Sequence, residues 1–131
     1  MTTISEALIA LVAADAGIVA LEADRRTAFR LPEPAVLPAT VYQKIDAHGS
    51  YAHGTARGLM TARYQVTHWA STLAEAEALA TAYRHCLDGF HGTMGSVRVD
   101  SIMCEDGPDL DEPTADATRV IRDYFITYAE V

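Results

Sequence analysis

The sequence has few cysteines and few basic residues, and both shortages narrow the classes of protein to which it can belong. Only two of its 131 residues are cysteines, and neither Cys86 nor Cys104 belongs to a CxxC or CxxH pair. So low a number argues against a disulfide-rich secreted scaffold and favours reduced thiols. Lysine and arginine together number 10 against 18 acidic residues, which gives a formal net charge of -8. Because gripping phosphate needs clustered cations, we do not expect a nucleic-acid-binding protein.

Long apolar runs are missing as well. No run approaches the roughly 20 apolar residues that span a bilayer. The N-terminus also has no basic segment before its apolar stretch, which a signal peptide would have. We therefore expect no contact with a membrane. Hydrophobic residues nevertheless make up 50% of the sequence, so we expect a single domain over residues 1–131 whose core needs neither disulfides nor metals.

A first helix is predicted near the N-terminus, where apolar residues recur at helical spacing from Ile4 onward. Thr3 or Ser5 can serve as its N-cap. Asp15 and Gly17 weaken the pattern, so we expect only a short helical continuation after them.

The clearest helix is "STLAEAEALATAYRHCLDG", residues Ser71–Gly89. Thr72 followed by Glu75 predicts a capping box, with Ser71 as the alternative cap. An alanine-rich apolar stripe favours close packing on a sheet. Gly89 is placed to end the helix as the residue after its C-cap.

Alternating or β-branched residues predict about four strands. They are "ATVYQKID" (Ala39–Asp46), "RGLMTARYQVTHWA" (Arg57–Ala70), a stretch centred on Val97–Met103, and "TRVIRDYFITYAE" (Thr118–Glu130). The second shows the alternation best: Met60, Ala62, Tyr64 and Val66 on one face, and Thr61, Arg63, Gln65 and Thr67 on the other. Ahead of the first strand, the three prolines of "LPEPAVLP" favour an extended lead-in. We expect an α+β fold: a mainly antiparallel or mixed sheet with a long central helix and an N-terminal helix packed on it.

Two predicted loops contain most of the candidate interface residues. "HGSYAHGTARG" (His48–Gly58) is predicted to be a mobile connector that becomes ordered at an interface, with Tyr51, His53 and Arg57 as contacts. "EDGPDLDEPTAD" (Glu105–Asp116) is predicted to be an acidic turn. It is either solvated or a contact for a basic partner surface. Its candidate contacts are Asp109, Asp111 and Glu112.

No pattern predicts catalysis or a cofactor. The five histidines are scattered, and His48 with His53 lacks the compact Cys/His spacing of a zinc site. His68 shares a face with Tyr64, which favours a hydrogen-bonded, partly buried side chain. His85 is next to Cys86, but adjacent helical residues do not face each other. We therefore expect neither an enzyme, nor a cofactor, nor a metal.

The order of several stretches is similar to a known family. These are "LPATVYQKI", "ARYQVTHWASTLAEAEALA", "LDGFHGTMGSVRV" and "DLDEPTADATRVIRDYFITYAE". With the first helix they cover nearly the whole chain. Together they resemble the tail-completion, or tail-terminator, proteins of long-tailed bacteriophages, prophages and gene transfer agents.

The resemblance implies a structural virion protein with a mixed sheet and packed helices. Such proteins form a ring, expected to be a hexamer, on the head-proximal end of the tail tube. They end tube growth and join the tail to the head connector. The expected partners are further copies of this chain, the tube protein and the head-tail connector or adaptor protein. DNA would pass through without specific binding, and assembly would take place in the cytoplasm of the bacterial host.

A ring needs two different complementary patches on each copy. Arg63 and Gln65 on the polar face of the second strand are candidates for one patch. The acidic turn, with Arg122 or Asp123 on the exposed face of the last strand, is a candidate for the other.

Two alternatives remain open from the sequence. The first is a small-molecule-binding or catalytic domain in which Tyr64, His68 and Trp69 line a pocket. The second is a neighbouring head-tail adaptor of the same virion.

Overall fold

A computed structural model of the chain describes residues 3–32, 36–49, 59–112 and 117–130. The side chains of residues 110–112 and 130 lie outside this description. In chain order the elements are α1 (Ile4–Ala13), α2 (Ala16–Glu22), β1 (Arg26–Ala28), β2 (Ala39–Gly49), β3 (Met60–Ala70), α3 (Leu73–Leu87), β4 (Gly92–Met94), β5 (Val97–Glu112) and β6 (Ala117–Glu130).

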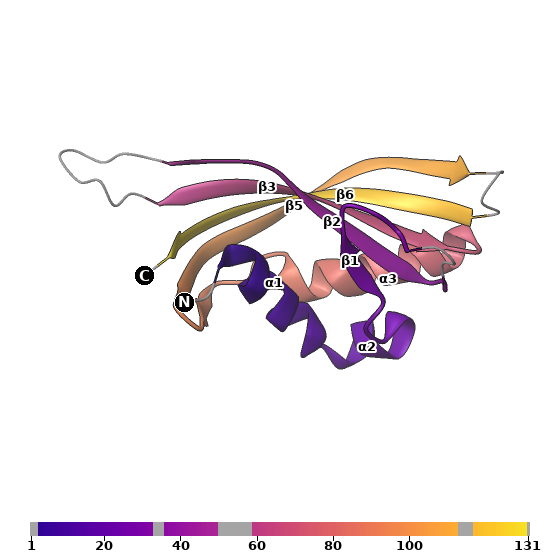
Figure 1. The fold of residues 1–131 in the computed structure, drawn as a ribbon, viewed down its shortest axis with the longest axis horizontal. Helices are drawn as coiled ribbons and strands as arrows, with labels where there is room; N and C mark the ends of the chain where they lie inside the picture. The colour runs from indigo at the N-terminus through magenta and orange to yellow at the C-terminus, as the bar shows by residue number, and fades with distance from the viewer. Residues whose placement is uncertain (1–2, 33–35, 50–58, 113–116, 131) are drawn as a thin grey trace.

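The strands form one sheet in the order β1-β2-β3-β6-β5-β4. β1 and β2 are parallel, and the other neighbours are antiparallel. All three helices lie against the same face of the sheet (Figure 1). The predicted α+β class is confirmed, but the described residues form six strands and not about four. β1 and β4 were missed because three residues each are too few to show alternation.

The predicted acidic turn is the second correction. β5 continues to Glu112, so Glu105–Glu112 is strand and not turn. Its pairing with β6 shifts between Asp106 and Asp109, which makes Gly107 and Pro108 a bulge. Glycine and proline mark turns in a sequence, yet at a bulge they serve inside a strand.

Close packing at the bulge gives a first prediction. A Cβ built on Gly107 would lie 2.8 Å from the carbonyl oxygen of Ile121, so Gly107→Ala must move backbone. We expect a loss of roughly 1–3 kcal/mol in the free energy of unfolding, measured by urea denaturation. Gly17→Ala is the control, because its Cβ would meet only the Asp15 side chain, at 3.2 Å. Equal changes in the two variants would contradict the close packing at Gly107.

Each helix begins at a side-chain cap. Thr3 accepts a hydrogen bond from the Glu6 backbone N–H at 3.2 Å, and Asp15 accepts one from Ile18 at 3.0 Å. Asp15 therefore starts a second helix where the sequence suggested only a weakened continuation. The predicted cap of α3 is confirmed, because Thr72 accepts from the Glu75 backbone N–H at 3.2 Å. The predicted stop is confirmed too, since Gly89 follows the C-cap with φ of 80°.

The main core lies between the sheet and the helices. The alternation predicted for β3 is confirmed: Ala62, Tyr64 and Val66 are buried, and the residues between them are partly exposed. α3 contributes Ala76, Leu79, Ala80, Tyr83 and Leu87. Several of these are alanines, so the helix can approach the sheet closely. The opposite face of the sheet has no helix over it among the described residues (Figure 1). We call it the uncovered face.

Candidate functional site

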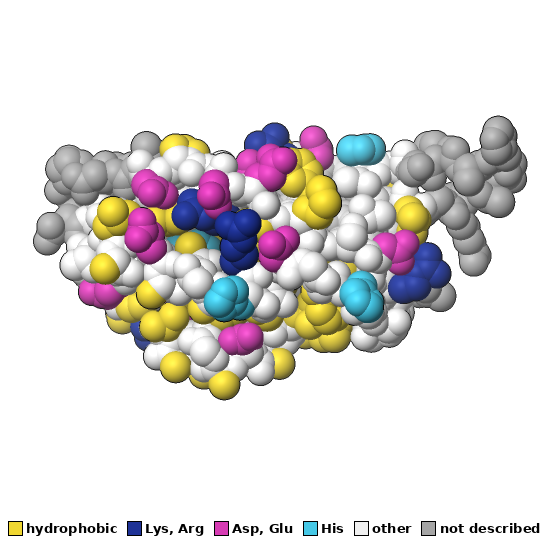
Figure 2. Space-filling model, turned by 180° about the vertical axis from the view of Figure 1, so that it is seen from behind, with side chains coloured by type: hydrophobic (Ala, Val, Ile, Leu, Met, Phe, Trp, Pro, Cys, Tyr) yellow, Lys and Arg dark blue, Asp and Glu magenta, His cyan; other side chains and the backbone are white. Residues whose placement is uncertain are grey.

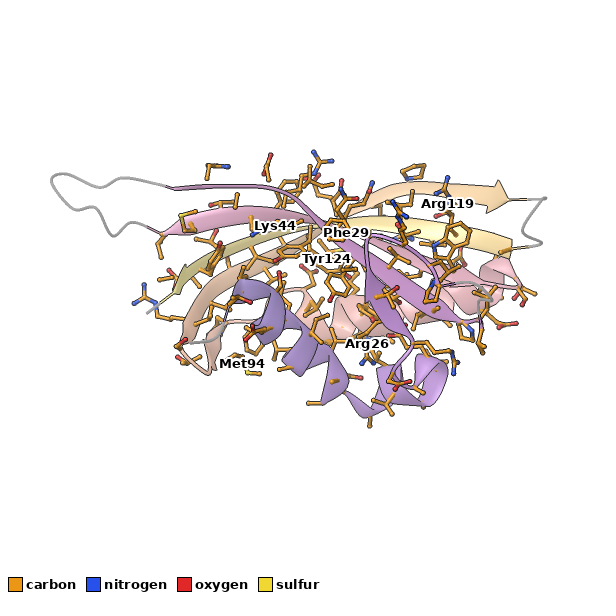
Figure 3. All side chains as sticks on the ribbon, viewed as in Figure 1. Arg26, Phe29, Lys44, Met94, Arg119 and Tyr124 are labelled. Carbon is orange, nitrogen blue, oxygen red and sulfur yellow. The ribbon has the colours of Figure 1, made fainter. Side chains whose placement is uncertain are left out.

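The most unusual feature beneath the sheet is a buried carboxylate. Glu22, the last residue of α2, has no exposed surface. Its carboxylate accepts hydrogen bonds from the Thr40 hydroxyl at 2.5 Å, the Tyr83 hydroxyl at 2.5 Å and Arg26 Nε at 3.1 Å. These partners come from β2, α3 and β1. Glu22 therefore connects four elements, and Arg26 lies toward α2 in Figure 3.

We call Glu22, Arg26, Thr40 and Tyr83 the Glu22 cluster. Burial shifts the pKa of two of its side chains. Burial raises the pKa of the Glu22 carboxyl, although Thr40, Tyr83 and Arg26 each act to lower it. Burial also raises the pKa of the Tyr83 phenol. Both carboxylate oxygens have partners, and the adjoining hollow of about 30 Å³ has room for roughly one water molecule. The cluster is arranged to hold elements together and leaves no space for a substrate.

His68 adjoins the cluster. It is fully buried, where we expected partial burial, and its Nδ1 lies 3.0 Å from the Thr40 hydroxyl. Its ring centroid is 4.5 Å from that of Tyr83. Burial, with a smaller contribution from the Arg122 charge, lowers the His68 pKa to about 3. The imidazole is therefore neutral at pH 7.

The alternative pocket of Tyr64, His68 and Trp69 is wrong. Tyr64 and His68 are buried on the helix side of β3. Trp69 alternates to the uncovered face, where its ring lies 5.3 Å from the Arg119 guanidinium. The sheet separates Trp69 from Tyr64 and His68, so the three side chains line no common cavity.

Two of the candidate interface residues lie where the alternation predicted. Arg63 and Gln65 are on the uncovered face of β3, opposite Phe125 and Asp123 of β6. Arg63 Nη2 pairs with Asp123 Oδ2 at 2.9 Å, and its guanidinium lies 5.8 Å from the centre of the Phe125 ring. This part of the uncovered face is held in place by its own contacts. Its role in assembly stays a prediction.

Arg122 corrects the predicted second patch. It is opposite the buried Val66, so it lies on the helix side and not on the exposed face of β6. Arg122 Nε pairs with Asp106 at 3.1 Å, and Nη1 pairs with Asp109 at 3.4 Å. Arg84 of α3 also reaches Asp106, at 3.4 Å. From behind, acidic side chains surround basic ones on this side of the molecule (Figure 2).

The remaining candidates lie outside the described side chains. Tyr51, His53 and Arg57 fall in residues 50–58, outside the described residues. Asp111 and Glu112 belong to β5, but their side chains are not described. Among the described candidates, the structure thus keeps Arg63 and Gln65 apart from Asp109 and Arg122, on opposite faces. The sequence could have placed Arg122 on the helix side, because it is two residues from both Val120 and Tyr124, which are buried, and residues two apart in a strand share a face.

The described residues show neither a reactive thiol nor a group of side chains that could bind a metal ion. Burial raises the pKa of the Cys86 thiol to about 11, so it stays protonated at pH 7. No three His, Cys, Asp or Glu side chains in the described ranges are grouped to hold a metal ion. Within the same ranges no single helix is long and apolar enough to cross a bilayer. Only α1 and α2 taken together pass that test, as a pair bent by 84°.

Comparison with known proteins gave one family match and a solved structure of similar fold. The family model described as "Tail completion protein gp17" matches residues 6–129. A chain in a solved structure titled "Virion of native gene transfer agent (GTA) particle" is similar with a TM-score of 0.72 and 18% sequence identity. The match covers 98% of this chain and 95% of that chain. At that identity the likeness shows the fold alone. No curated protein matches the chain significantly.

Proposed function

This chain belongs to the family of tail completion proteins, and from that premise we propose that it closes the head-proximal end of a tail tube as a ring. The ring stops tube growth and presents a surface to the head connector. The observation that carries the proposal is the family match over residues 6–129. The order of the elements is consistent with it, since the virion chain of similar fold is matched over nearly its whole length.

The charge of the protein suits a ring through which DNA moves. A net charge of -8 disfavours adhesion of phosphate, so a bore lined by such a protein keeps friction low. The proposal therefore includes no specific DNA contact and no catalytic step. The partners are further copies of this chain, six in a closed ring, the tube protein and the head-tail connector. The ring is placed in the virion tail and assembles in the host cytoplasm.

The sheet supports a ring because its two outer edges differ. A closed ring uses heterologous contacts, in which one patch of each copy meets a different patch of the next. Here one edge is formed by β1 and β2, and the other by β5 and β4. The edges differ in sequence and length, as a head-to-tail contact between two different patches requires.

Size-exclusion chromatography coupled to light scattering tests the proposal. We expect the protein to reach the mass of a closed ring, either alone or after tube protein is added. We also expect it to stop the growth of tubes, so that they end shorter than tubes grown without it. Some rings close only on their tube, so a monomer in isolation is compatible with the proposal. A protein that stays monomeric with tube protein present, and leaves tube length unchanged, overturns it.

A further inference from the structure

The Thr40 hydroxyl lies between two buried side chains that can each hold or release a proton. Its oxygen is 2.5 Å from Glu22 Oε1 on one side and 3.0 Å from His68 Nδ1 on the other. Thr40 is 1% exposed, and the other two residues have no exposed surface. Bulk water does not reach the site, so these three groups have to satisfy one another.

The charge of Glu22 decides which neighbour receives the Thr40 proton. A hydroxyl has one proton, so it donates to only one of the two. Glu22 Oε2 accepts from the Tyr83 hydroxyl at 2.5 Å and from Arg26 Nε at 3.1 Å. The Arg26 guanidinium favours the ionised carboxylate. Because an ionised carboxylate accepts hydrogen bonds and donates none, Thr40 donates to Oε1.

The tautomer of His68 follows from this direction. With its proton on the side of Glu22, the Thr40 oxygen only accepts from the ring. His68 therefore carries its proton on Nδ1, and Nε2 is a bare lone pair. Nε2 is buried and has no hydrogen-bond partner within the described ranges. The Arg122 charge disfavours a second proton on the ring, so the imidazole stays neutral.

The same geometry also accommodates a neutral Glu22. A proton on Oε1 donates to the Thr40 oxygen, and the Thr40 hydroxyl turns to donate to His68 Nδ1. The ring proton is then on Nε2. Oε2 keeps its lone pairs and still accepts from Tyr83 and Arg26. Every hydrogen bond of the cluster is kept in both states, and only the directions of two bonds are reversed.

We propose that Thr40 is a switch that ties the tautomer of His68 to the charge of Glu22, with the ring proton on Nδ1 when Glu22 is ionised and on Nε2 when it is neutral. A change of charge at the end of α2 thus reaches β3 through β2, while the cluster holds these elements together in both states. The switch lies within one copy of the chain and does not depend on the proposed ring. The charged and titratable groups that lie around the pair on the other elements are Arg26 on β1, Tyr83 on α3 and Arg122 on β6.

Glu22→Gln tests the switch, because the hydrogen bonds dictate how the new amide lies. Its oxygen takes the position of Oε2, where Tyr83 and Arg26 donate. Its NH2 group then takes the position of Oε1 and donates to Thr40. Thr40 donates in turn to His68, so we expect the ring proton to move from Nδ1 to Nε2. Long-range proton–nitrogen correlation spectra near neutral pH show which ring nitrogen carries the proton.

Three further variants make the spectra decisive. His68→Gln identifies the His68 signals among those of the other histidines. Glu77→Gln removes the same charge from an exposed position on α3 and should leave the His68 proton on Nδ1. Thr40→Val removes the hydroxyl, so in that background the His68 tautomer should be the same with Glu or Gln at position 22.

Acidification of the unmodified protein gives a second route that needs no variant to fold. Burial raises the pKa of the Glu22 carboxyl above 4.5, whereas burial lowers the pKa of His68 to about 3. Glu22 therefore takes up its proton first. We expect the ring proton to move from Nδ1 to Nε2 while the imidazole is still neutral.

Each outcome decides the proposal. A proton that is on Nδ1 in the unmodified protein and moves to Nε2 in Glu22→Gln, but not in the Thr40→Val background, supports the switch. A proton already on Nε2 near neutral pH overturns it, and so does the same tautomer with Glu and Gln at position 22. A shift that persists in the Thr40→Val background overturns the role of Thr40. If Glu22→Gln does not fold, a direct change from the Nδ1 form to the imidazolium on acidification overturns the switch.

Discussion

Acidification from about pH 7 to about pH 4 is expected to remove roughly 3 kcal/mol of folding free energy through His68 alone. The ordinary His pKa is 6.5, and in the folded protein it is lowered to about 3. The unfolded chain therefore binds a proton in this range and the folded chain does not. The stabilisation is complete above pH 6.5 and is lost progressively as the pH falls toward 3.

The groups around His68 explain the size of this pH effect and the choice of His68→Gln as the control. Thr40 and the Tyr83 ring contact it, and the Arg122 charge disfavours its protonation. Glu22 acts in the opposite direction: its raised pKa makes stability rise as the pH falls toward 4.5. His68→Gln keeps Glu22 and the surface carboxylates, so the difference between the two pH profiles isolates the imidazole. Parallel profiles from urea denaturation, or an NMR titration of His68 near its ordinary pKa, would contradict the assignment.

The second large effect is expected from Glu22→Ala, which should lower the free energy of unfolding by about 3–5 kcal/mol. Removal of the carboxylate leaves the Tyr83 hydroxyl and Arg26 without their acceptor in a buried site. Glu22→Gln should cost less, because its amide oxygen still accepts a hydrogen bond. Chemical denaturation gives both values.

Glu77→Ala is the control for this comparison, because Glu77 is an exposed carboxylate on α3. We expect it to change stability by no more than about 0.5 kcal/mol. If Glu22→Ala were as mild as Glu77→Ala, the cluster would not hold the elements together. Because Arg26 and Thr40 form part of the β1–β2 pairing, the Glu22 variant should also loosen the pairing of β1 with β2.

Local patterns in the sequence predicted much of the fold. Side-chain alternation identified the buried face of β3, and the cap at Thr72 and the stop at Gly89 bounded α3. These features depend on residues only a few positions apart. β1 and β4 have no such pattern, because three residues gain their strand conformation from a neighbour. Gly107 and Pro108 led to the wrong prediction of a turn, because these residue types also occur at a bulge inside a strand.

The buried cluster was beyond local prediction. Glu22 is a glutamate at the end of a short helix, which in a sequence indicates a solvated side chain. Its hydrogen-bond partners Thr40 and Tyr83 are 18 and 61 positions away in the chain. Only the tertiary fold brings them together.

Electron microscopy of tail tubes assembled with this protein tests the central claim most directly. The account predicts a ring of this protein on one end of each tube, and tubes of more uniform length than those grown without it. Tubes with bare ends that continue to grow in excess protein, or protein bound along the tube wall, would contradict it.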